Sequence, residues 1–345
     1  MGARAGSGGA GAAGASGPGR SVTTPAILLV VAGLACQEVG ASIAVLLFPQ
    51  VGPLGMVMLR LVFSAIILLL IARPRMRGHS RADWTGVALF GLVLALMNGL
   101  FYLALERLPL GVTVTIEVLG PLVLSIVAAR RASAWLWAVL ALVGVVALGG
   151  GGWDRLDPLG VLFALGAAGS WAFYILASAR VGRAFPKLDG LALAMTVGAV
   201  IALPFGIADA GTALLRPEIV ALGAAVAILS STIPYAFELI ALRRLPAAVF
   251  AILMSLAPAT AALAGFIFLG QHMTWLEIAG IGLVIAASIG AVRSSSRAAR
   301  EAAEPDSRRG GHGARGTPVA GSAADGRMPR AACDAATGGS IRSGP

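Results

Sequence analysis

The sequence predicts an all-α membrane protein with ten transmembrane helices, arranged as two inverted five-helix repeats. Three observations support this prediction. Hydrophobic residues make up 58% of the chain and charged residues only 12%, whereas charged residues alone reach about 25% in soluble domains. Long apolar runs recur along the chain, and one segment is repeated at an offset of 137 positions.

The apolar runs predict helices because they are continuous and lack the alternation of barrel strands. A helix needs roughly 20 apolar residues to cross about 30 Å of hydrocarbon. Charged residues, prolines and glycines separate the runs. The ten predicted spans are residues 25–48, 52–72, 84–105, 109–129, 133–152, 158–179, 189–208, 218–241, 246–269 and 273–292.

Both ends of the chain differ in composition from the apolar region. Residues 1–24 are rich in glycine and alanine, and residues 294–345 are polar and basic. Neither segment has enough large apolar side chains to bury a core, so both are predicted to be disordered tails. The N-terminal tail lacks the plan of a secretory signal and is expected to be retained.

The basic residues of the short loops predict the orientation. With a cytoplasmic N-terminus, the loops assigned to the inside hold eleven Arg or Lys residues and those assigned to the outside hold three. The three outer residues are Arg107, Arg155 and Arg216. Because cytoplasmic loops carry an excess of positive charge, both tails are predicted to be cytoplasmic. The same pattern explains the net charge of +10 without a nucleic-acid partner, and none is expected.

The repeated segment indicates an internal duplication. When the chain is shifted by 137 positions, residues 103–121 align with residues 240–258, and eight of the nineteen pairs are identical. The offset corresponds to five predicted spans, and an odd number of spans reverses the orientation of the second copy. We therefore expect a first repeat over residues 25–152 and a second over residues 153–293, with a substrate site near the midplane between them.

One difference between the two copies agrees with this inversion. The phrase ALERLP at residues 104–109 returns as ALRRLP at residues 241–246, so that Glu106 becomes Arg243. The first copy lies in an outer loop and the second in an inner loop. The exchange of an acid for a base is therefore what the positive-inside rule predicts.

Four ionisable residues lie within the predicted spans: Glu38, Arg60, Glu117 and Glu238. A charge at the bilayer centre costs at least about 2.5 kcal/mol, so each of them requires a partner or a cavity. At 1.5 Å per residue, Glu38 lies about 15 Å, and Arg60 and Glu117 about 12 Å, from the outer ends of their helices. These three residues form either an ion pair that fastens helices together or part of a transport cavity; Glu238 lies nearer the inner interface.

In a cavity, these groups suit charged groups of a substrate. A guanidinium binds a carboxylate with two hydrogen bonds, and a buried carboxylate suits an ammonium group or a proton. Pro121 and Pro258, which are repeat mates, each leave the carbonyl four residues earlier without its helical donor. Such helix breaks either line a cavity or serve as packing kinks.

Aromatic and amide residues complete the candidate site. Asn98 and Tyr235 are repeat mates, and Trp171 and Tyr174 lie deep enough in their span to form a cavity wall. Tyr102 is expected at the membrane interface, where tyrosine is common.

The predicted spans lack the sequence motifs of enzymes and of metal sites. The two cysteines are predicted to form neither a disulfide nor a metal site, because Cys36 lies in the first span and Cys333 in the C-terminal tail. The three histidines, His79, His272 and His312, lie in or beside loops or in the tail. No zinc-protease or diphosphate-binding pattern is present in the spans. The sequence thus predicts no enzyme, no cofactor and no metal.

Several phrases resemble a known family. They are NGLFYLALERLPLGV, EVLGPLVLSIVAARR, GSWAFYILA and ILSSTIPYAFELIALRRLP, followed by LMSLAPATAALAGF. These phrases are similar to the threonine and homoserine exporter group of the drug/metabolite transporter superfamily, whose members have two EamA-type domains. The resemblance extends from about residue 35 to residue 291. It implies a ten-helix bacterial inner-membrane carrier that exports small amino acids and is coupled to the proton gradient.

The resemblance also assigns individual residues. Arg60, Glu117 and Glu238 match charged positions of this group. Ala257 stands where the group usually has glutamate before a proline, and Val45 where it often has lysine. These departures leave open an efflux carrier for another small solute or a toxic amphiphile. A membrane scaffold or sensor is a further alternative, and the protein is expected as a monomer or a homodimer within the lipid bilayer.

Overall fold

The computed structural model describes residues 23–129, 132–148, 156–242, 244–245 and 247–303. The chain divides into two compact units after Glu301, and the helices below lie in the first unit, apart from the last two residues of the final helix. Every regular element in the described residues is helical. Within these described ranges, eight helices are long and apolar enough to cross a membrane. The predicted all-α class is therefore confirmed.

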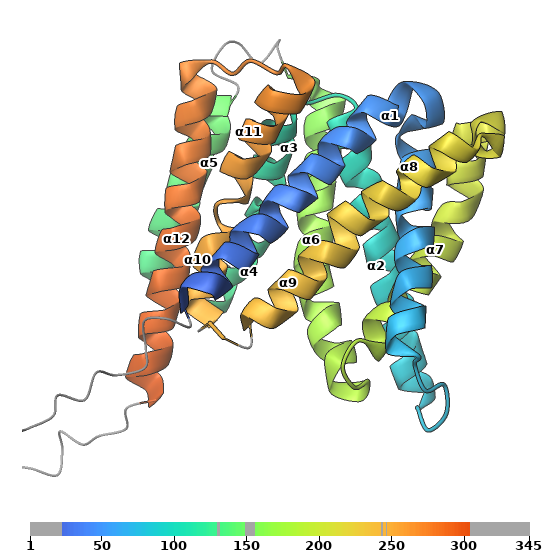
Figure 1. Ribbon diagram of the computed structural model, residues 1–345. Coiled ribbons are helices and arrows are strands. Elements are labelled where there is room, and N and C mark those ends of the chain that lie inside the picture. The colour runs from blue at the N-terminus through green and yellow to red at the C-terminus, as the bar shows by residue number, and fades with distance from the viewer. Residues whose placement is uncertain (1–22, 130–131, 149–155, 243, 246, 304–345) are drawn as a thin grey trace, which may run out of the picture. The chain divides into compact units, whose positions relative to one another are not determined.

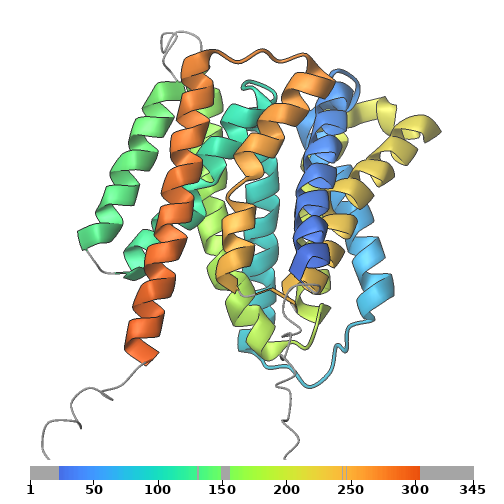
Figure 2. The ribbon, with the colours of Figure 1, turned by 60° about the vertical axis from the view of Figure 1, so that its left-hand side comes forward.

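The described part of the first half of the chain contains five helices, which are labelled in Figure 1 and seen from another direction in Figure 2. Their bounds are α1 Thr23–Ala72, α2 Arg81–Leu105, α3 Leu110–Glu117, α4 Leu119–Ala129 and α5 Ala132–Leu148. The second half contains α6 Pro158–Ala184, α7 Asp189–Ala210, η2 Gly211–Leu215, α8 Pro217–Ala227, η3 Ile228–Thr232, α9 Ile233–Leu242, α10 Ala247–Met254, α11 Ala257–Leu269 and α12 Trp275–Ala303.

Helix α1 covers two predicted spans, 25–48 and 52–72. Its backbone leaves the helical region at Gly52, with φ 67° and ψ 165°, and Figure 1 shows the two parts of α1 meeting in a turn. A positive φ favours glycine. The carboxylate of Asp209 in α7 accepts hydrogen bonds from the backbone N–H groups of Leu54 (2.8 Å) and Gly55 (3.2 Å). It thus caps the second part of α1 from a residue distant in sequence.

Some other predicted boundaries differ from the structure or lie outside its described part. The span predicted at 133–152 corresponds to α5, whose apolar stretch Trp135–Leu148 is shorter than the other spans; residues 149–152 lie outside the described part. Helix α12 continues to Ala303, past the predicted end of the span at 292, because the Ala- and Arg-rich residues that follow favour helix. The expected tail 1–24 lies almost entirely outside the described residues.

The helices pack through small residues on their inner faces. Helix α1 contacts α7, α8 and α9, α2 contacts α6 and α7, and α3 contacts α11. Gly144 of α5 and Gly280 of α12 lie so close that a Cβ on either would meet the backbone of the other. Such close contacts are typical of helix pairs in membranes. Large apolar side chains, including Leu70, Leu136 and Phe173, are exposed on the outside, where a bilayer would cover them.

Candidate functional site

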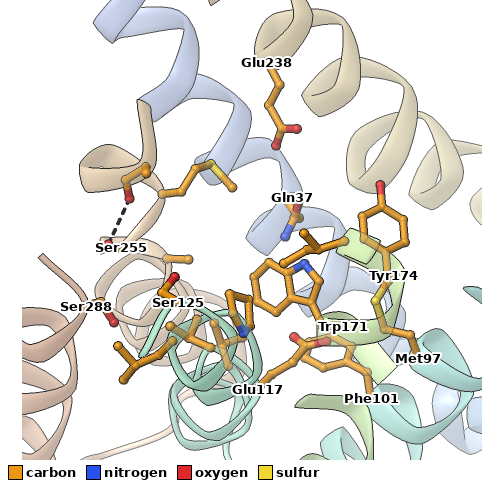
Figure 3. A pocket seen from close by; sticks show the side chains of 18 of the residues that line it. Gln37, Met97, Phe101, Glu117, Ser125, Trp171, Tyr174, Glu238, Ser255 and Ser288 are labelled. Atoms are coloured by element: carbon orange, nitrogen blue, oxygen red, sulfur yellow. Dashed lines mark hydrogen bonds between the residues drawn. The ribbon is translucent and has the colours of Figure 1, made fainter. Parts of the chain in front are cut away.

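A cavity of about 400 Å³ lies among the helices. Its wall is formed by side chains from α1, α2, α3, α4, α6, α9, α10, α11 and α12. The volume is within the range of small-molecule sites, about 300 to 1,000 Å³. Most of the wall is apolar, and polar groups enter it from several helices (Figure 3).

The structure brings the four predicted ionisable residues to this one cavity. Glu38, Arg60, Glu117 and Glu238 all line it. Arg60 lies close enough to interact electrostatically with both Glu38 and Glu117, and Glu117 also acts on Glu38. Glu238, which the sequence places nearer the inner interface, lines the same cavity. A basic group and three acidic groups thus share one cavity.

Arg60 is held by groups from two distant segments. Its Nε donates to the hydroxyl of Ser231 (3.2 Å) and its Nη2 to the carbonyl of Ser230 (3.1 Å). Its Nη1 donates to the hydroxyl of Tyr102 (3.3 Å), and its guanidinium carbon lies 5.6 Å from the centre of the Tyr102 ring. These contacts orient the plane of the guanidinium.

Tyr102 differs from its predicted position. It is completely buried and bonds to Arg60, whereas the sequence suggested an interfacial residue. The reason is tertiary: the ring packs against Phe48 and Phe101, and its hydroxyl finds a buried partner.

Pro234 explains why the carbonyl of Ser230 is available to Arg60. In an α-helix this carbonyl would accept from the N–H of residue 234, and proline has none. The chain instead forms the π-helical turn η3, in which the N–H of Ile233 bonds to the carbonyl of Ile228. Such turns are frequent at functional sites. Sequence reasoning missed Pro234, although a proline here frees the carbonyl of Ser230 in the same way as Pro121 and Pro258 free the carbonyls four residues before them.

The helix breaks expected near Pro121 and Pro258 are present. Helix α3 ends at Glu117 and α4 begins at Leu119, while α10 ends at Met254 and α11 begins at Ala257. Pro121 lines the cavity. Pro258 is buried in the first turn of α11, and its neighbour Ala257 provides the lining surface there.

The predicted aromatic and amide residues divide into two groups. Asn98, Trp171 and Tyr174 line the cavity. The side-chain amide of Asn98 donates to the carbonyl of Leu94 (2.8 Å), and the ring of Tyr174 packs against Phe90 with centroids 5.3 Å apart. The side chain of Tyr235 lies outside the described part of the structure.

Several lining residues were missed by sequence reasoning. They are four polar residues and one methionine within apolar spans: Gln37, Ser125, Ser255, Ser288 and Met97 (Figure 3). A serine in an apolar run gives little signal, because its hydroxyl commonly bonds to its own helix. Only the packing of the helices identifies those that face the cavity.

The two departures from the family pattern occupy different places. Ala257 lines the cavity, so the missing glutamate removes a charge from its wall. Val45 is half-buried and packs against the core of the helical unit. Among the described residues, no group of three His, Cys, Asp or Glu side chains is arranged to hold a metal ion.

Comparison with known proteins identifies the family. The threonine/homoserine exporter RhtA of Escherichia coli (strain K12) is 39% identical over 281 residues, which cover 80% of this chain and 95% of that protein. The chain belongs to the threonine/homoserine exporter family. The exporter of the same name from Salmonella typhimurium (strain LT2) is 39% identical over 278 residues, covering 80% and 94% of the two chains.

Two further comparisons concern the second half of the chain and the fold. The sequence model of the EamA-like transporter family matches residues 158–293. A protein of known crystal structure shares the fold with a TM-score of 0.52 and 18% identity, covering 81% of this chain and 99% of that chain. The chain is thus a multi-pass membrane transporter and not an enzyme, as the sequence predicted.

Proposed function

We propose that this protein exports small amino acids of the threonine and homoserine type, or related metabolites, across the bacterial inner membrane, driven by the proton gradient. The observation that carries the proposal is the cavity in which Arg60, Glu38, Glu117 and Glu238 meet. A zwitterion carries one group of each charge, and the relatives of this chain are named as threonine/homoserine exporters.

The substrate site follows from the chemistry of these groups. The Arg60 guanidinium binds the substrate carboxylate, because its planar donors match two carboxylate oxygens. Glu117 binds the ammonium group or carries the proton, with Glu38 and Glu238 as further acidic groups. Asn98, Trp171 and Tyr174 form part of the cavity wall. The interrupted helices at Pro121 and Pro258 allow this wall to change shape during transport.

Two inverted five-helix repeats form the proposed architecture, over residues 25–152 and 153–293. The helix bounds support it: adding 137 to Leu110–Glu117 of α3 reproduces Ala247–Met254 of α10. The turn at Gly52 separates α1 into two spans. Counting α5 as a span gives the remaining helix of the first repeat.

Both termini face the cytoplasm in this proposal. The start of α1 and the later part of α12 lie at the same end of the helical unit (Figures 1 and 2). The connections at that end contain Arg73, Arg75 and Arg77 after α1 and Lys187 before α7. Several lining residues, including Ser125, Glu238 and Val292, lie in the halves of their helices toward this end. We infer that the cavity faces the cytoplasm, the side from which an exporter is loaded.

An alternative substrate is an amphiphile with an apolar body. Its supporting observation is the group of large apolar side chains in the wall, Met97, Phe101, Trp171 and Phe250. A charged substrate needs the acidic and basic groups, whereas an amphiphile needs mainly this apolar surface.

Flux measurements distinguish the two. The purified protein is reconstituted in vesicles with an imposed proton gradient, and the flux of labelled threonine, homoserine, other amino acids and a cationic dye is followed. We expect gradient-dependent flux of threonine and homoserine. Flux of the dye alone would overturn the amino-acid proposal in favour of the alternative, and no flux of any compound would overturn both.

A further inference from the structure

Ser288 of α12 differs from most hydroxyl residues in the described spans. Its side chain is 6% exposed and lines the cavity. No described group lies in hydrogen-bonding position to its Oγ. A buried hydroxyl without a partner is costly, typically about 1–3 kcal/mol, so its place in the wall requires an explanation.

Other serines and threonines of the described helices follow the usual pattern. Ser255 also lines the cavity, and its hydroxyl donates to the carbonyl of Ala251 at 2.9 Å. Ser42 and Thr196 likewise donate to carbonyls four residues earlier. Ser288 lies in a regular helix with the same opportunity, and its hydroxyl makes no such bond.

Three other buried hydroxyls also lack a described partner: Ser64, Ser230 and Thr232. None of them is among the lining residues of the cavity. Ser288 therefore combines two properties that no other described serine or threonine shares: a buried, unpaired hydroxyl and a position in the wall. In Figure 3 it lies to one side of the cavity, with Trp171 and Tyr174 toward the other.

We propose that the Ser288 hydroxyl recognises a hydroxyl on the substrate side chain and so determines specificity. This inference rests on the proposed export of small amino acids. A hydroxyl both donates and accepts, and threonine and homoserine, which name the relatives, share a side-chain hydroxyl. The substrate's charged groups bind at Arg60 and Glu117, and its side chain extends toward α12.

Valine provides the discriminating probe, because it has the shape of threonine with a methyl group in place of the hydroxyl. A site that hydrogen-bonds a substrate hydroxyl rejects the analogue that lacks it, since its own polar group then remains unpaired. We expect the parent protein to prefer threonine over valine. We expect Ser288→Ala to reduce that preference roughly tenfold, mainly by raising the KM for threonine.

The experiment measures KM and maximal flux for labelled threonine and valine in vesicles containing the parent, Ser288→Ala or Ser64→Ala. Ser64→Ala is the matched control, because it removes another buried and unpaired hydroxyl, at a residue that does not line the cavity. Both substrates are compared on the same protein, so a loss of folded transporter affects them equally and leaves the ratio unchanged.

A reduced threonine-to-valine ratio in Ser288→Ala alone supports the inference. An unchanged ratio, or an equal reduction in Ser64→Ala, overturns it while the export function stands. If the parent carries neither amino acid, the proposed function fails and the inference fails with it.

Discussion

Arg60 shows how a single charged residue is accommodated in a membrane domain. Its guanidinium donates to a serine hydroxyl, a backbone carbonyl and a tyrosine hydroxyl, and it also faces the carboxylates of the cavity. The donors of a guanidinium lie in one rigid plane. Fixing some of them therefore determines where the others point.

Replacing Arg60 by lysine tests this geometry. Arg60→Lys keeps the charge and loses the planar donors, so we expect export at low threonine concentration to fall at least about tenfold. Arg107→Lys, in an exposed connection, is the control and is expected to transport normally. Parent-like flux in a well-inserted Arg60→Lys protein would indicate that only the charge matters.

Glu117 is the acidic residue at the break between α3 and α4. Its repeat mate is the apolar Met254, and Ala257 supplies no carboxylate nearby. The second repeat therefore has no carboxylate at these positions that could replace Glu117. Glu117→Gln keeps size and removes titration. We expect normal insertion and a loss of gradient-driven export of at least about tenfold, from the loss of a charged partner.

The control for this variant is Glu106→Gln, at an exposed helix end. Export by Glu117→Gln at the parent rate and with the parent's pH dependence would exclude Glu117 as proton carrier and as essential ammonium partner.

Helices in this protein are shaped by residues that interrupt them. Gly52 turns α1 back on itself, Pro121 and Pro258 accompany the breaks in the α3–α4 and α10–α11 segments, and Pro234 produces the π-helical turn η3. Each interruption leaves backbone groups without their helical partners. At η3 and at the α1 turn, side chains from other helices, Arg60 and Asp209, satisfy them.

Pro234→Ala restores an N–H at position 234. The Ser230 carbonyl then has a helical donor, and we expect Arg60 to lose an acceptor and the KM for threonine to rise roughly tenfold. In an Arg60→Lys background the same change should have little further effect, because residues that act through one group are not additive.

Pro204→Ala serves as the control for this experiment, since Pro204 lies within α7 and is exposed. If the effects of Pro234→Ala and Arg60→Lys simply add, Pro234 does not act through Arg60.

At the scale of the whole molecule, charge is distributed between the two ends of the helical unit. The connections at the end that holds the start of α1 are rich in arginine and lysine, while the opposite end has few basic residues, Arg107 and Arg216 among those described. This distribution predicts which end lies in the cytoplasm.

Labelling with a membrane-impermeant maleimide checks the orientation. In a background with Cys36→Ser and Cys333→Ser, we expect Arg216→Cys to be labelled from outside intact cells and Lys187→Cys only after the membrane is opened. Both positions are exposed. The reverse labelling pattern would contradict the orientation and the cytoplasmic cavity with it.

The sequence by itself determined the helical membrane class, the approximate limits of the helices and the ionisable residues of the spans. These properties follow from local causes: a span must match the thickness of the hydrocarbon core, and a charge within it needs a partner. For the same reason the composition of the spans was enough to predict a role for Glu38, Arg60, Glu117 and Glu238.

Only the tertiary structure decided how these residues are held and which neutral side chains join them. Arg60 and Ser231 are 171 positions apart, and Asp209 caps a turn 155 positions away. The place of Ser288 in the cavity wall depends likewise on how α12 packs. Local sequence rules carry no information on such contacts, because they arise when helices far apart in the chain bury their faces against one another.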